Sequence, residues 1–246
     1  MTDHVNSLGQ PIGAPVPTWT ERRKPPRAVM QGRYCRLEPL DPRARGKELF
    51  EAMAADREGQ LWTYMAYGPF ATHEAYTGWM YLTCMGDDPQ FYAIIDQVSG
   101  KAVGIASYLR IDPKSGSIEV GYITYSPAIQ KSRIGAETMF LMMKRSFDEM
   151  AYRRYEWKCD ALNGPSRAAA VRLGFSYEGL FRQATVYKGR NRDTAWYSII
   201  DKEWPLLKAA FEAWLDPANF DAAGQQKARL SVLTAEALRA SRAPIA

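Results

Sequence analysis

The residues best suited to chemistry lie between Glu119 and Ala136, in the stretch EVGYITYSPAIQKSRIGA. Its first half is rich in β-branched and aromatic residues up to the Ser126-Pro127 pair, which predicts a strand. Its second half is typical of a helix start. A helix N-terminus offers free N–H groups and the positive end of the helix dipole, so this loop suits a pyrophosphate. The loop residues that would contribute are Gln130, Lys131, Ser132, Arg133, Gly135 and Ala136.

A second polar motif follows later in the chain. Asn163 and Ser166 precede an alanine run, and the segment ends with Arg172-Leu173-Gly174-Phe175. Pro165 near the start and Gly174 at the end predict a short helix of about two turns. Ser166 is also in a position to cap this helix.

Composition excludes several classes of protein. The only histidines are His4 and His73, and neither has the neighbours of a metal site or a catalytic triad. The three cysteines are far apart, which predicts free buried thiols in a reducing, cytoplasmic setting. No run approaches the ~18 apolar residues of a membrane span, and we expect no secretion signal. A net charge of +5 favours an anionic partner.

The surrounding segments predict alternating helices and strands. We expect strands at 32–40, 91–95, 102–109, 155–159, 179–187 and 192–200, and helices at 41–55, from Thr72, at 136–150, 204–214 and 228–239. The helix at 136–150 has one apolar face, and Lys144, Arg145, Asp148 and Glu149 fall largely on the other. The connection at 58–70 is unusually aromatic. Its residues Trp62, Tyr64 and Tyr67 would either line a substrate wall or cap the core.

Together, the two motifs resemble those of the GNAT superfamily of N-acetyltransferases. Gln130-x-x-Arg133-x-Gly135 is similar to its phosphate-binding pattern, although Arg133 stands where a glycine is usual. Asn163-x-x-Ser166 with Arg172-x-Gly174-Phe175 resembles the branch of ribosomal-protein N-acetyltransferases, with Arg172 in place of a lysine. The resemblance implies an α/β (α+β) fold with a mixed, mostly antiparallel sheet splayed at its central strand. It predicts a domain at 31–201, an extended arm at 1–30, either docked or disordered, and a helical extension at 202–246.

The resemblance further implies acetyl-CoA as co-substrate, without a metal. Ile123 and Thr124 would pair with the coenzyme amides, Asn163 would contact the pantetheine arm or acetyl group, and Arg172 would add to the coenzyme site. Direct attack by an amine needs a base and a proton donor, not a protein nucleophile. Glu119 is the candidate base, or else a carboxylate that faces solvent or pairs with an arginine. Ser166 is the candidate thiolate partner, with Tyr177 as an alternative.

Other functions stay open at this point. One alternative is a transferase for another acyl group. A second is a module that binds an acyl-CoA without catalysis, which Arg133 in a glycine position suggests. Binding to nucleic acid would need a clustered basic stripe, which the sequence lacks. The acceptor is either a small-molecule amine or a peptide or protein N-terminus, and a homodimer is left open.

Overall fold

A single mixed sheet organises the chain in the computed structural model, which describes residues 4–243. The strand order is β1-β2-β3-β4-β5-β6-β8-β7, and every neighbouring pair is antiparallel except β5 with β6. The sheet confirms the predicted fold class. The strands are β1 (Met30–Gln31), β2 (Cys35–Pro39), β3 (Gln90–Asp96), β4 (Ala102–Asp112), β5 (Ser117–Tyr125), β6 (Arg154–Asp160), β7 (Ser176–Tyr187) and β8 (Arg190–Ile200).

Helices flank this sheet, and their starts follow local chemistry. The Asp41 carboxylate accepts from the backbone N–H of Arg43 and Ala44, and the Thr72 hydroxyl accepts from Ala75, so both predicted N-caps are confirmed. The α-helices are α1 (Pro42–Ala54), α2 (His73–Thr83), α3 (Arg133–Lys144), α4 (Gly164–Arg172), α5 (Trp204–Leu215) and α6 (Leu230–Ser241). A single π-helical turn, Arg145–Glu149, continues α3.

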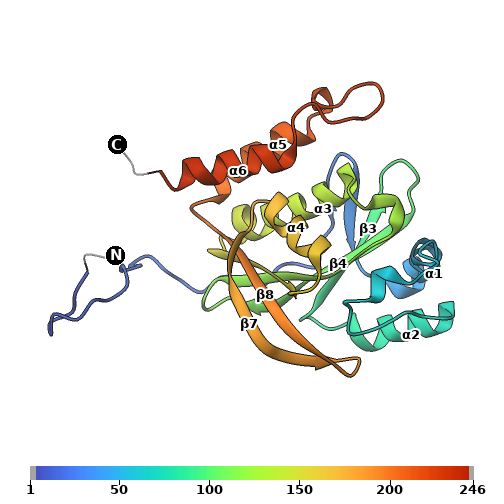
Figure 1. Ribbon diagram of the computed structural model, residues 1–246, viewed down its shortest axis with the longest axis horizontal. Coiled ribbons are helices and arrows are strands. Elements are labelled where there is room, and N and C mark those ends of the chain that lie inside the picture. Colours follow the sequence, from blue (N-terminus) through green and yellow to red (C-terminus); the bar gives the residue numbers. More distant parts are fainter. Residues whose placement is uncertain (1–3, 244–246) are drawn as a thin grey trace.

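The two faces of the sheet carry separate cores. On one face, Ile118, Val120 and Tyr155 pack with α3 and with α5. On the other face, Phe91 and Ile105 pack with residues of α1, of α2 and of the aromatic loop between these helices. Figure 1 shows α3 and α4 above the sheet with α5 and α6 beyond them, and α1 and α2 on the opposite side. The site described below therefore has two approaches, one from each face.

The helix after the anion loop is more deeply buried than its sequence predicts. Arg145 was expected on a polar face, but its side chain is 5% exposed. Its guanidinium donates to the carbonyls of Ala28 and Val29, because the N-terminal arm covers this side of the helix. Buried Glu137 similarly accepts three backbone N–H groups at the start of β2. The arm thus converts a predicted surface into an interior.

Segments near both ends of the described chain contact the domain, although the residues before Trp19 extend away from it (Figure 1). The Trp19 indole N–H donates to the Lys114 carbonyl at 3.0 Å, and its ring covers Gly116. At the other end, α5 packs on α3, with Phe211 and Phe140 stacked at 5.7 Å between centroids. Residues 1–3 and 244–246 of the predicted arm and extension lie outside the described residues.

Two further observations concern the environment of the chain. Cys35, Cys84 and Cys159 are free and buried, as the sequence predicts. Among the helices of residues 4–243, none has the length and apolar character needed to cross a membrane.

Candidate active site

The central feature of the site is the point where β5 and β6 separate. These parallel strands pair only between Ser117–Val120 and Arg154–Trp157. Beyond that point, β6 continues through Lys158–Asp160 paired with β8 alone, and β5 continues through Gly121–Tyr125 paired with β4 alone, within the described residues. The two strands therefore leave a V-shaped opening with one free edge on each side, and a free edge can accept another extended chain.

A bulge bends β5 at the base of this opening. Tyr122 has a φ of 50°, and the pairing with β4 shifts between Ser107 and Ile105. The predicted coenzyme-pairing residues Ile123 and Thr124 follow the bulge directly. Thr124 is buried, and its hydroxyl lies 3.1 Å from the Tyr67 hydroxyl. The bulge thus directs the free edge of β5 away from β6.

The predicted anion loop forms a helix N-terminus at the wide end of the opening. Ser132 is the N-cap of α3, and its hydroxyl accepts from the Gly135 N–H at 3.3 Å. A Cβ on Gly135 would lie 2.9 Å from the Ile129 carbonyl and 3.0 Å from the Tyr125 ring. Glycine is therefore required here by packing, and the buried Ala136 continues the tight contact. The close fit holds the helix N-terminus against the end of β5.

Three side chains of this loop have different environments. Gln130 is exposed and its amide donates to the Tyr125 carbonyl, whereas Lys131 is exposed with a φ of 56°. Arg133 was expected to extend toward a phosphate. Its guanidinium instead lies 4.8 Å from the ring centroids of both Tyr34 and Phe220. This cation–π contact links α3 to the segment between α5 and α6.

Arg172 supplies a second cation on the same face of the sheet. It is half-buried, and burial lowers its pKa while the nearby Tyr125 hydroxyl raises it. No carboxylate among residues 4–243 forms an ion pair with it. Tyr125 also donates to the Gly135 carbonyl at 3.0 Å, so Arg172 lies near the start of α3. An unpaired, partly desolvated guanidinium at a helix N-terminus is suited to bind an anion.

Asn163 and Ser166 lie at the narrow end of the opening. The Asn163 side-chain oxygen Oδ1 accepts from the Ser166 N–H at 3.0 Å, so Asn163, not Ser166, caps α4. The Ser166 hydroxyl accepts from the Trp157 indole N–H at 3.0 Å. Trp157 is the last residue of β6 that pairs with β5. Ser166 is therefore held where the two strands part.

Glu119 faces the opposite side of the sheet from α3. Its side chain is 4% exposed, and Oε2 lies 2.7 Å from Arg110 Nη1 and 2.8 Å from Lys158 Nζ. No hydrogen bond to Oε1 exists within the described part of the chain. That atom is 3.6 Å from the position a Cβ on Gly121 would occupy, so the glycine leaves space in front of it. The carboxylate is thus held by two cations through one oxygen and keeps the other free.

Lys158 is a site residue that sequence reasoning missed. Its side chain is 8% exposed and also pairs with Glu156 at 2.7 Å, and its ammonium lies 3.8 Å from the Trp196 ring centroid. It is the first residue of β6 beyond the pairing with β5. The alternation of Glu156 and Lys158 along one strand face was the available signal, but the partner on β5 appears only in the folded chain.

The aromatic loop divides between core and site. Trp62 is buried against Tyr67, Phe70 and Tyr76, so it supports the loop from within. The Tyr67 ring stacks on Trp79 at 4.3 Å and on Tyr122 at 5.7 Å, which places it beside the β5 bulge. The Tyr64 hydroxyl donates to the Leu162 carbonyl at 3.0 Å. Tyr64 and Tyr67 therefore lie near the opening, whereas Trp62 belongs to the second core.

The β7–β8 hairpin reaches this same loop, which the sequence did not predict. Lys188 Nζ donates to the Trp62 carbonyl at 2.8 Å, and Arg190 Nη2 donates to the Thr63 carbonyl at 2.7 Å. The Tyr187 hydroxyl donates to Asp160 at the end of β6. Residues 62–64 and 187–190 thus form an arch, on the Glu119 side of the opening.

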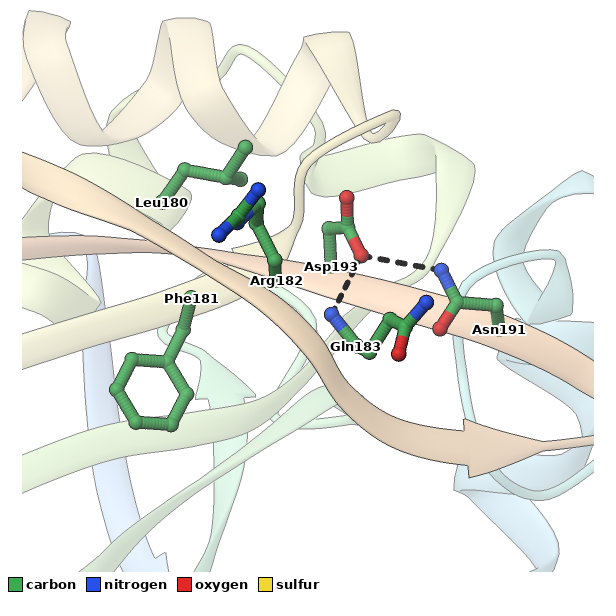
Figure 2. Close-up of a pocket in the computed structure, with 6 residues that line it drawn as sticks. All are labelled: Leu180, Phe181, Arg182, Gln183, Asn191 and Asp193. Carbon is green, nitrogen blue, oxygen red and sulfur yellow. Dashed lines mark hydrogen bonds between the residues drawn. The ribbon is translucent and has the colours of Figure 1, made fainter.

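The hairpin also carries a bulge with an open cavity of about 650 Å³ beside it. Phe181 pairs with Thr194 and Thr185 with Arg192, so three residues of β7 oppose one of β8. Figure 2 shows the Asp193 carboxylate joined to Gln183 and Asn191 beside Arg182. The hydrogen bond from the Gln183 backbone N–H to Asp193 accompanies a φ of 50° at Gln183, at the bulge of β7.

Comparison with known proteins agrees with this geometry. Residues 36–176, more than half of the chain, match the acetyltransferase (GNAT) domain family. A GCN5-related N-acetyltransferase from Brucella melitensis is 48% identical, with a TM-score of 0.88 over 89% of this chain and 100% of that chain. RimL, a ribosomal L7/L12 α-N-protein acetyltransferase solved with coenzyme A, is 20% identical with a TM-score of 0.58 over 71% of this chain and 99% of its own, and shares the fold.

A curated relative, named as a putative ribosomal N-acetyltransferase, is YdaF of Bacillus subtilis, 29% identical over 43% of this chain. The chain spans 63% and 57% of the lengths of the two curated relatives that it matches. The domain match covers β3 to β6 together with α3 and α4. The chain belongs to the GNAT acetyltransferase family.

Proposed function

We propose that this protein transfers an acetyl group from acetyl-CoA to a primary amine by direct attack of the amine on the thioester. The observation that carries the proposal is the opening between β5 and β6. It connects an anion-binding helix N-terminus on one face of the sheet with a carboxylate on the other. A co-substrate that crosses the sheet there would have its phosphates and its reactive group at opposite ends.

The side chains around the opening fit such a co-substrate. Arg172 is an unpaired cation beside the α3 N-terminus, and exposed Lys131 can approach phosphate oxygens. Gln130 is also exposed, although its amide donates to the Tyr125 carbonyl. The free edge at Ile123 and Thr124 would pair with amide groups as an added strand does. Arg133 is assigned a structural part instead, because its guanidinium is held between two aromatic rings.

Two side chains would move protons during the transfer. Glu119 Oε1 accepts a proton from the attacking amine, directly or through one water, because Oε2 is occupied by Arg110 and Lys158. Ser166 is held at the narrow end by Trp157 and is positioned to donate to the departing thiolate. Attack on a thioester also benefits from a donor to the developing oxyanion. The side-chain N–H₂ of half-buried Asn163 is our candidate for contact with the pantetheine arm or acetyl group.

Two alternatives keep the same fold. A longer acyl group would need space beside Tyr67 and Tyr122, where the rings are stacked at 5.7 Å, and this favours acetyl. A binding module without catalysis would not need a carboxylate with a free oxygen at the strand separation. The names of the ribosomal relatives favour a protein or peptide N-terminus as acceptor, and a small amine is the second candidate.

A single assay series tests the proposal. Acetyl-CoA should raise the melting temperature, because a ligand bound only by the native state stabilises it. Thiol release should then depend on a primary amine in a panel of peptides, amino acids and polyamines. Stabilisation without turnover on any amine would favour the non-catalytic module. No stabilisation at millimolar acetyl-CoA would refute the coenzyme site itself.

A further inference from the structure

The β7–β8 hairpin, whose turn forms part of the arch on the acceptor side, is rich in cations that form no ion pair with a carboxylate in the described chain. The hairpin segment 182–192 contains Arg182, Lys188, Arg190 and Arg192, and no acidic residue. None of these four forms an ion pair with a carboxylate within residues 4–243. At the base of the opening the pattern is different, because Arg110, Arg154 and Lys158 all pair with glutamates.

The hydrogen bonds that these cations donate go to neutral groups. Lys188 and Arg190 donate to backbone carbonyls of the aromatic loop, and Arg192 donates to the Thr194 hydroxyl. Arg182 is exposed beside the hairpin cavity, where its charge helps to lower the pKa of Asp193 without forming an ion pair with it (Figure 2). Desolvation lowers the pKa of Lys188, and repulsion from the neighbouring Arg190 lowers it further.

The carboxylates nearby do not balance this charge. Asp160 accepts from the Tyr187 hydroxyl and the Leu162 N–H, and Asp193 accepts from Gln183 and Asn191. Four cations and two neighbouring carboxylates therefore give these six residues a formal charge of +2.

These cations do not lie at the site proposed for the coenzyme phosphates. The anion loop and Arg172 lie on the face of the sheet covered by α3, together with Tyr125. The arch joins the loop between α1 and α2, which belongs to the core on the other face. The acceptor amine would arrive on that second face, where Glu119 and Lys158 lie.

We infer that the acceptor carries a negative charge close to its amine, and that the cations of the hairpin, Arg182 foremost, recognise it. The inference rests on the proposed function and specifies its acceptor. The recognised group is a carboxylate, from either an acidic side chain beside a peptide N-terminus or the α-carboxylate of a free amino acid. Cations on the rim of a cleft concentrate an anionic substrate and select against cationic ones.

The test compares acceptors that differ only in charge. The peptide amides Ser-Asp-Asp, Ser-Ala-Ala and Ser-Lys-Lys vary the side chains, and serine against serine amide varies the α-carboxylate. We expect kcat/KM for the acidic peptide, for free serine, or for both to exceed that of its neutral counterpart about tenfold, and the difference to shrink at high salt. The pair that shows the difference identifies the source of the carboxylate.

A charge reversal assigns the effect to the hairpin. Arg182→Glu should lower kcat/KM for the preferred anionic acceptor about tenfold, with a much smaller effect on the neutral one, and Arg182→Gln should lie between. Arg239→Glu on α6 is the matched control, because Arg239 is exposed and remote from the arch. It should change none of these values. Melting temperatures of all variants verify that they are folded.

The results separate this inference from the proposed function. If kcat/KM is the same for neutral or basic acceptors as for acidic ones, the proposed acetyltransferase activity is retained and the anionic acceptor is refuted. Equal losses from Arg182→Glu and Arg239→Glu would likewise refute recognition by the hairpin. No turnover on any acceptor would remove the proposed function, and this inference with it.

Discussion

Replacing Glu119 with glutamine tests the proposed base most directly. An amine attacks only when neutral, and an alkylamine at neutral pH is mostly protonated. A positioned general base contributes roughly 10²- to 10⁴-fold. Because Oε1 of Glu119 is the only oxygen of that carboxylate without a partner in the described chain, we expect Glu119→Gln to lower kcat roughly 10²-fold or more. The affinity for acetyl-CoA should change little.

The structure also bounds the damage that this change does to folding. Glutamine removes the negative charge from two ion pairs at once. Lys158 keeps its pair with Glu156 at 2.7 Å, and the Arg110 side chain is 61% exposed and remains solvated. The loss of stability should therefore be about 1–3 kcal/mol, below the 3–5 kcal/mol typical of an orphaned buried charge.

A matched control separates the two effects. Glu156→Gln removes a partner of the same Lys158 but leaves the Glu119 carboxylate in place. Thiol release at saturating acetyl-CoA, followed from neutral pH to about pH 9, should show a large deficit for Glu119→Gln that shrinks as the amine loses its proton to solvent. Equal deficits in the two variants, or near-normal kcat in Glu119→Gln, would refute the assignment of Glu119 as the base.

Three further predictions concern the coenzyme site and the sheet. Arg172→Gln should weaken acetyl-CoA binding by about tenfold in calorimetry, less so at high salt, since it removes an unpaired cation at a helix N-terminus. Gly135→Ala should lower the free energy of unfolding, measured in urea, by about 1–3 kcal/mol and should weaken acetyl-CoA binding, because the new Cβ would lie 2.9 Å from the Ile129 carbonyl. The hydrogen bond from Arg154 holds the pKa of Glu178 in the folded protein below its usual value. The stabilisation from this pair is therefore fully present above the pKa of Glu178 in the unfolded chain, about 4.3, and is lost as pH falls through the lower pKa in the folded protein. The melting-temperature deficit of Arg154→Met should therefore shrink as pH falls from 7 to below about 4, and a constant deficit would contradict it.

The sequence alone determined the elements that local chemistry controls. The caps at Asp41 and Thr72, the strand that ends before Pro127 and the presence of a helix start in the anion loop all depend on residues within a few positions of each other. For the same reason, the anion loop and the Asn163 motif were recognisable, and with them the family and the order of its elements. Local patterns of this kind do not depend on which segments later become neighbours.

Long-range packing decided the rest. Arg145 has the sequence pattern of a surface residue and becomes buried because residues 28 and 29 offer it two carbonyls. Arg133 follows the phosphate-loop pattern, and in the folded chain its guanidinium lies against aromatic rings at positions 34 and 220. In both cases the partner is remote in sequence, so no local signal identifies it.

The acceptor side of the site depends on tertiary structure most of all. Glu119 is a strand carboxylate in the sequence, and only the pairing of β5 with β6 brings Lys158 to 2.8 Å from it. The arch joins residues 62–64 to 187–190, more than a hundred positions apart, through bonds from lysine and arginine to backbone carbonyls. Carbonyl acceptors carry no side-chain signature, and therefore only the folded chain shows which cations remain free to meet a substrate.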